Sequence, residues 1–383
     1  MRLQLQLWSF VPAFAIAVVG CANASSTDRA LPADAGTLPS DAGVARPDAG
    51  AARPDAGRDA GTDAAALEGL ILASDSQTED SPANIYVVRP DGTGTCYLTN
   101  DGNWNRNAGW SYDGTKVVWN VRNSTGGIWI MDATGANKTA LTPLPSQAFG
   151  PAFSPDGSSI AYSDYPAGNG GPSPLVGIEV YVMNADGTNK RQLTTTTVNG
   201  TTKTATVIRW SNRPAYSPDG TKIVYSSTQS GNSEIWDMNA DGTDPRQLTV
   251  NTDPKGPDAN FPSYSPDGTK IAFLCGFETL YGNICVMNSD GTGRAQLTDN
   301  PDDGLQMDEP SSDEPAWSPD GKSILFDSNQ YDPNLGQRAA ETWVMNADGS
   351  DQRVLLPHMY GEGRNPWRND PVMASGTTFM CQM

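Results

Sequence analysis

The stretch PSYSPDGTKIAF, Pro262 to Phe273, decides the fold, because the chain repeats it in altered form. The other copies start at four positions, Ala108, Pro151, Pro214 and Pro315. A second phrase, EIWDMNADGTDPRQLT, Glu234 to Thr249, also has counterparts further along each repeat. The residues of a catalytic site usually occur once in a chain, whereas a motif that recurs at regular intervals indicates a repeated structural unit.

Each repeat consists of short strand-like segments separated by turn-forming residues. In the unit that starts at Pro214, the segments PAYS and TKIVYSS flank the tight-turn sequence Pro218-Asp219-Gly220. After a loop, EIWDMN and a short segment ending in QLT flank a second turn, NADG. The alternating β-branched residues predict strands, and no segment has a helical period. Four short strands in a repeat of roughly 40 residues are typical of a propeller blade.

The number of turns predicts how many blades there are. Six second turns occur, but only five complete first strands, because the first unit begins directly with GLILASDS. The C-terminal stretch GRNPWRNDP, Gly363 to Pro371, resembles a degenerate first strand. The predicted fold is therefore all-β, a six-bladed β-propeller of four-stranded antiparallel blades. We expect the C-terminal segment to close the ring onto the first blade, because closure removes exposed sheet edges.

These residues carry a family resemblance. DEPAWSPDGKSILF, Asp313 to Phe326, and IWDMNADGTDPRQLT, Ile235 to Thr249, resemble the WD40-like, or PD40, repeat of TolB-type six-bladed propellers. The resemblance covers about residues 67 to 379 and implies a fold more strongly than a function. Propellers of this type include periplasmic binding proteins, the propellers of prolyl-oligopeptidase-type peptidases and some polysaccharide lyases.

The N-terminus predicts export. Residues 1–20 contain one Arg and an apolar run that is too short for a spanning helix, so they are interpreted as a signal peptide. The run ends in Val18-Val19-Gly20-Cys21, which resembles a bacterial lipobox with Cys21 as the lipidated residue, and Ala22 after it implies the outer membrane. The alternative is cleavage after Ala22-Asn23-Ala24, which would release a soluble protein. Residues 21–66 are rich in Ala, Asp, Gly, Pro and Arg and predict a disordered tether, so the propeller occupies residues 67–383.

Charge and composition restrict the function. The formal net charge of −19 disfavours nucleic acid as a partner. His358 is the single histidine, and no G-x-S-x-G or C-x-x-C motif occurs, so a Ser-His-Asp triad or a His-rich zinc site is not indicated. The lyases that share the fold depend on several histidines with a metal, which this chain does not supply.

Turn aspartates are interpreted as structural, since each turn has one Asp, with calcium loops as the alternative. The loop from Asp299 to Glu314 is the exception, because its acidic residues are dense enough to repel one another unless solvent or a cation screens them. Calcium is therefore the one cofactor hypothesis, with a site predicted at Asp302, Asp303, Asp308 and Glu309.

Four cysteines remain if Cys21 is lipidated, and they allow three connectivities. Cys275 and Cys285 fall on neighbouring strands of the fifth blade, where facing Cβ atoms come within reach of a disulfide. Cys96 and Cys381 form the second predicted pair if the C-terminus returns to the first blade, and buried free thiols are the alternative.

Topology places the recognition surface. Because strands alternate in direction, the two short turns of each repeat share one face, here called the tight-turn face. The long, variable loops share the opposite face, here called the loop face. The residue before the strand-A proline should lie at the central channel on the loop face, and we call these residues the mouth positions. They are Asn107, Gly150, Arg213, Phe261, Glu314 and, less securely aligned, Arg364.

Asn107, Arg213, Phe261, Glu314 and Arg364 are the predicted ligand-binding residues, with ion pairs that plug the channel as the alternative. The predicted function is a non-catalytic, monomeric cell-envelope module that binds a protein or peptide and touches the membrane only through its lipid. The alternatives are a carbohydrate-active hydrolase or lyase that uses carboxylates, and a structural envelope component.

Overall fold

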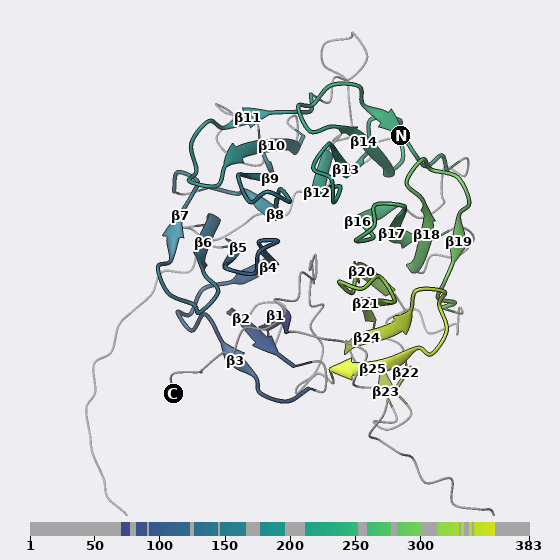
Figure 1. Ribbon diagram of the computed structural model, residues 1–383, viewed down its shortest axis with the longest axis horizontal. Helices are drawn as coiled ribbons and strands as arrows, with labels where there is room; N and C mark the ends of the chain where they lie inside the picture. The colour runs from purple at the N-terminus through teal and green to yellow at the C-terminus, as the bar shows by residue number, and fades with distance from the viewer. Residues whose placement is uncertain are drawn as a thin grey trace, which may run out of the picture. The chain divides into compact units, whose positions relative to one another are not determined.

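The computed structural model describes residues 70–76, 82–89, 92–122, 126–144, 146–165, 177–195, 211–251, 259–276, 282–300, 312–328, 331–332, 337–338 and 341–356. The signal peptide, the tether, Cys21, His358, Arg364, Cys381, the predicted calcium residues and the predicted closing strand lie outside these ranges. Six antiparallel blades surround a common centre, and the first strand of each blade lies nearest to it (Figure 1). The predicted all-β six-bladed propeller is confirmed.

The blades follow one another along the chain. The first has three described strands, β1 (Ile71–Ser76), β2 (Ala83–Val88) and β3 (Cys96–Tyr97). The second contains β4 (Asn105–Trp110), β5 (Lys116–Val121), β6 (Gly127–Asp132) and β7 (Thr139–Ala140). The third contains β8 (Phe149–Phe153), β9 (Ser159–Asp164), β10 (Glu179–Asn184) and β11 (Arg191–Gln192).

The remaining blades repeat this order. The fourth contains β12 (Ser211–Tyr216), β13 (Lys222–Ser227), β14 (Glu234–Asn239) and β15 (Arg246–Gln247). The fifth contains β16 (Asn260–Tyr264), β17 (Lys270–Cys275), β18 (Asn283–Asn288) and β19 (Ala295–Gln296). The sixth contains β20 (Ser312–Trp317), β21 (Ser323–Ser328), β24 (Glu341–Asn346) and β25 (Arg353–Leu356), with a small hairpin of β22 (Tyr331–Asp332) and β23 (Gln337–Arg338) between β21 and β24.

The SPDG phrase forms the turn between the first two strands of a blade. In the fourth blade, Ser217 Oγ donates to Asp219 Oδ1 at 2.6 Å, and the Thr221 N–H donates to the same oxygen at 3.0 Å. The Lys222 N–H then donates to Ser217 Oγ at 2.9 Å, which starts the next strand. The hydrogen bonds to its carboxylate, above all the one from Ser217 and then the one from the Thr221 N–H, hold the pKa of Asp219 below its ordinary value. The repeated aspartate is thus a structural acceptor within its own turn.

The NADG phrase forms the second turn and also joins neighbouring blades. Its glycine has a positive φ, +90° at Gly291, and a Cβ placed there would lie 2.8 Å from the carbonyl oxygen of Leu248 in the preceding blade. Equivalent contacts join Gly187 to Leu141 and Gly349 to Leu297. Glycine is therefore required at this position for two reasons, the positive φ angle and the close contact with the preceding blade. At the ring junction, Gly92 of the first blade faces Leu356 of the sixth.

The Leu-Thr phrase fastens the outermost strand. The Thr249 hydroxyl accepts a hydrogen bond from the Ile235 N–H at 2.8 Å and donates to the buried Glu234 carboxylate. The same threonine-to-strand bond occurs at five blades, with acceptors Thr99, Thr142, Thr194, Thr249 and Thr298. Each short outer strand therefore gains a side-chain bond that compensates for its two-residue ladder.

The hydrophobic core lies between blades. Phe153 of the third blade packs with Val118 and Ile128 of the second, and Tyr216 of the fourth packs with Ala161 and Val180 of the third. First and sixth blades share a cluster as well, formed by Ile71, Ala73, Val88, Ala316, Leu325 and Val344. The described first and sixth blades thus meet through side-chain packing.

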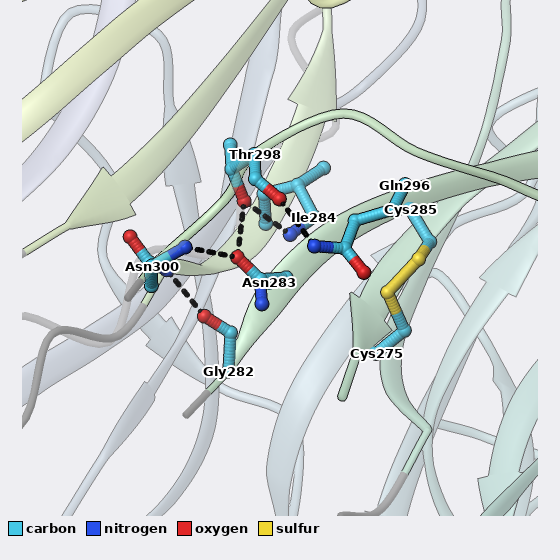
Figure 2. Close-up of a disulfide and its surroundings, with 8 residues drawn as sticks. All are labelled: Cys275, Gly282, Asn283, Ile284, Cys285, Gln296, Thr298 and Asn300. Carbon is cyan, nitrogen blue, oxygen red and sulfur yellow. Dashed lines mark hydrogen bonds between the residues drawn. A yellow bond between two sulfur atoms is a disulfide. The ribbon is translucent and has the colours of Figure 1, made fainter. Parts of the chain in front are cut away.

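A disulfide joins Cys275 and Cys285 in the fifth blade (Figure 2). This is the pair predicted from the hairpin, but its geometry differs from the prediction. The strand register places Cys285 opposite Phe273, and Cys275 opposite Asn283, so the two cysteines are diagonal rather than facing neighbours. Their Cα atoms are 5.7 Å apart, which suits a disulfide. Cys96 is also disulfide-bonded.

Candidate functional site

The mouth positions share an unusual backbone conformation. The φ angles of Asn107, Gly150, Arg213, Phe261 and Glu314 are 51°, 60°, 56°, 54° and 50°. In each of these blades the ladder between the first and second strands shifts register around the same position, which marks a β-bulge. Residues other than glycine adopt this left-handed conformation at an energetic cost, so four of the five equivalent positions are strained, and Gly150 is the exception.

The bulge also frees a backbone N–H, which in two blades binds the preceding blade. The Arg213 N–H donates to Ser163 Oγ at 3.0 Å, and the Gly150 N–H donates to Asn120 Oδ1 at 3.4 Å. These bonds fix the height and orientation of the mouth residue relative to its neighbour. The side chain at that position is left to vary.

Three mouth residues form one connected cluster. Arg213 Nη1 donates to Glu314 Oε1 at 2.6 Å, which links the fourth blade to the sixth. Phe261 of the intervening blade lies against the guanidinium, with its ring centroid 4.2 Å from Arg213 Cζ. The Glu314 side chain is 2 % exposed and that of Arg213 is 17 % exposed. Ion pairing at the mouth, one of the two hypotheses drawn from the sequence, is therefore present, and it leaves the arginine as the more accessible partner.

Asn107 holds the same position in the second blade. Its side chain is buried, and its Nδ2 has no hydrogen-bond partner within the described structure. Gly150, in the third blade, offers no side chain. The mouth positions therefore include a partly exposed guanidinium in the fourth blade, a buried amide in the second and a residue without a side chain in the third.

Comparison with known proteins supports the architecture. Residues 120–367 match the model of the TolB β-propeller domain, PD40. The chain belongs to this TolB β-propeller domain family. Over 138 residues it is 32% identical to the Protein TolB homolog of Chlorobaculum tepidum, an alignment that covers 36% of this chain and 27% of that protein. The matched part thus spans about a quarter of this relative's length.

Solved structures show the same fold for this TolB-family propeller. TolB from Acinetobacter baumannii superposes with a TM-score of 0.59 at 19% identity, covering 77% of this chain and 65% of that one. A putative TolB from Agrobacterium tumefaciens gives a TM-score of 0.55 at 19% identity, covering 76% and 94%. At this level of identity the likeness shows the fold alone.

The tight-turn face of the TolB-family propeller carries two cavities that the sequence reasoning did not find. One of about 460 Å³ lies between the third and fourth blades, and its lining includes Arg191, Tyr216 and Asp156. One of about 550 Å³ lies between the fourth and fifth blades, with Arg246 and Tyr264 at the equivalent positions. In the sequence, these cavities could have been recognised from an Arg in the outer strand of one blade that is followed by a Tyr in the inner strand of the next blade.

The described residues bear on the sequence-based hypotheses of metal binding and membrane spanning. Within them, no group of three or more His, Cys, Asp or Glu side chains is arranged to hold a metal ion. The predicted calcium residues and His358 fall outside the described ranges. The described part of the chain also contains no helix with the length and hydropathy needed to cross a membrane.

Proposed function

We propose that this chain is a non-catalytic binding module of the cell envelope that takes up a protein or peptide partner on its loop face. One observation carries the proposal: the mouth positions keep a single left-handed backbone conformation while their residues are Asn, Gly, Arg, Phe and Glu. Where the fold alone sets the residue, as in the SPDG and NADG turns, the chain repeats it. A rigid frame that presents different side chains is the arrangement expected of a recognition surface.

The envelope location rests on the N-terminal sequence and on the family. A lipid on Cys21 with a tether of residues 21–66 would hold the propeller off an outer membrane. Replacing Cys21 with Ser should then move the mature protein from the membrane fraction to unprocessed or soluble material. Unchanged fractionation and mass would refute the anchor and leave the binding proposal standing.

The binding proposal is tested by crosslinking and capture from native envelopes. The test variant is Arg213→Asn with Glu314→Gln, since Asn is already the mouth residue of the second blade and the double change removes both charges of the ion pair. The control is Lys116→Gln with Asp132→Asn, which removes an ion pair of the same 2.6 Å length on the tight-turn face. We expect the first variant, and not the second, to lose the captured partner at least ten-fold. Equal capture by all three proteins, or no specific capture by the unmodified chain, would refute the proposal.

The hydrolase or lyase alternative gains no support from the described residues. It predicts turnover on a glycan panel that carboxylate variants abolish. Such turnover would replace the binding proposal.

A further inference from the structure

Arg213 is held in one orientation by its backbone conformation and by three contacts. Its backbone adopts a φ of 56°, and its N–H is fixed by Ser163 Oγ at 3.0 Å. Glu314 takes a hydrogen bond from Nη1, and the Phe261 ring covers the guanidinium at 4.2 Å. An arginine placed this way has already lost most of the side-chain freedom that ligand binding would otherwise remove.

The guanidinium has more donors than its neighbours use. Arginine carries five N–H donors in a planar fork, and the side-chain hydrogen bond of Arg213 in the described structure is the one from Nη1 to Glu314. No nitrogen of Arg213 is among the buried side-chain atoms that lack a partner. Its remaining donors therefore reach solvent at the centre of the loop face.

A second mouth residue has a buried donor without a partner in the described part of the chain. Asn107 occupies the equivalent place in the second blade and is 6% exposed, yet its Nδ2 makes no hydrogen bond within the described residues. A buried amide donor left without an acceptor is unfavourable, and such groups in native proteins call for an explanation. Donors at two mouth positions indicate a ligand that supplies acceptor oxygens.

We infer that the partner presents a carboxylate to the mouth, where it binds the solvent-facing edge of Arg213. This inference rests on the proposed function and specifies the chemistry of the partner. Two coplanar oxygens match the guanidinium fork, and such bidentate pairs are strong and directional. Glu314 is a positioning residue that holds the other edge, and Phe261 supports one face of the pair. The net charge of −19 disfavours a doubly charged phosphate more than a singly charged carboxylate.

The carboxylate has two sources, a polypeptide C-terminus or an Asp or Glu side chain, and small probes separate them. N-acetylphenylalanine carries an α-carboxylate, and N-acetylphenylalanine amide is the same molecule without it. N-acetylglutamate α-amide carries a side-chain carboxylate alone. Each is titrated into the full chain labelled with ¹⁵N-arginine, while the Nε–H resonance of Arg213, assigned by its loss in Arg213→Lys, is followed by NMR.

We expect a saturable shift of the Arg213 resonance with at least one carboxylate probe and none with the amide. The shift of the Arg353 resonance, on the opposite side of the sixth blade, should stay flat, and Arg353→Gln should leave the titration unchanged. Asn107→Ala should weaken binding about three- to ten-fold if its amide also contacts the ligand. A linear, unsaturated response, or an equal response to the amide probe, would overturn the inference.

The envelope capture experiment separates this inference from the proposed function. Arg213→Lys keeps the positive charge and removes the planar fork, and we expect it to reduce partner capture at least five-fold. If the unmodified chain captures a partner and Arg213→Lys captures it equally well, the carboxylate inference is wrong while the proposed function stands. If the unmodified chain captures nothing specific, the proposed function itself fails.

Discussion

Reduction of the Cys275–Cys285 disulfide should cost the propeller about 3 kcal/mol of unfolding free energy. The bond closes a loop with a sequence separation of 10 residues. In the chain-entropy model, a loop of this size restricts the unfolded state by about 9 cal/mol/K, or about 3 kcal/mol at 25 °C. For a domain on the order of 300 residues, this corresponds to a fall in Tm of about 5 °C.

The other blades show what the disulfide replaces at this cross-strand site. At the equivalent cross-strand site, other blades hold aromatic pairs, with ring centroids 6.1 Å apart for Trp119 and Trp129 and 6.4 Å apart for Phe326 and Trp343. Such pairs contribute about 0.5–1.5 kcal/mol beyond burial. In the fifth blade Cys285 stands opposite Phe273, so this blade lacks the aromatic pair. The expected stabilisation by the disulfide, about 3 kcal/mol, is larger than the contribution of the aromatic pair that it replaces.

The measurement is equilibrium unfolding in guanidinium chloride, followed by tryptophan fluorescence, with and without a reducing agent. Because Cys96 is also disulfide-bonded and Cys381 is its partner in the sequence-based prediction, the experiment uses the Cys96→Ser, Cys381→Ser background. Adding Cys275→Ala and Cys285→Ala should abolish the response to reductant. In that protein, changing position 285 to Trp instead of Ala should recover about 1 kcal/mol by restoring an aromatic pair. A loss below about 1 kcal/mol on reduction would refute the loop-entropy reasoning.

Three further predictions concern the turns and the mouth. Gly291→Ala should cost at least about 2 kcal/mol more than Gly157→Ala in denaturant unfolding, because both have positive φ but only Gly291 faces a carbonyl oxygen at 2.8 Å; equal losses would contradict the inter-blade role. Arg213→Asn alone should cost about 3 kcal/mol, and more than Arg213→Asn with Glu314→Gln, because the single change removes the guanidinium that pairs with a buried carboxylate while the carboxylate keeps its charge. A smaller loss for the single variant than for the double variant would contradict this reasoning. The pKa values of the turn aspartates are lowered from 3.8 in the folded state, so their stabilisation is present above the unfolded value and is lost as pH falls through the folded values. Unfolding free energy should therefore decline below about pH 4, and a flat profile down to about pH 2.5 would contradict the turn bonds.

The blade count and the position of the strands described in each blade could be predicted from the sequence because each turn is encoded by adjacent residues. Pro, Asp and Gly fix the turn within four residues, and alternation fixes the strands on either side. The role of the turn glycine between blades could not be predicted in the same way. Gly291 meets Leu248, and no local pattern says which carbonyl a residue will face after the ring has closed.

The disulfide shows a similar limit. Spacing around a hairpin identified the two cysteines, but the exact register decides whether they face one another or lie diagonally. One residue of loop length changes that register, and the loop between the strands varies from blade to blade. The diagonal arrangement of Cys275 and Cys285 is therefore a property of the folded blade.

The mouth positions were located by topology, yet their conformation runs against local preference. Arg213, Phe261 and Glu314 adopt φ values of 50° to 56°, where glycine would fit without strain, as Gly150 does in the third blade. Each such residue costs on the order of 1 kcal/mol in backbone energy. If these positions served only to form the β-bulge, glycine in every blade would form it without this backbone cost. The chain instead retains a guanidinium, a phenyl ring and a carboxylate at these places and brings the three into contact, which is why the mouth, rather than the repeated turns, carries the functional proposal.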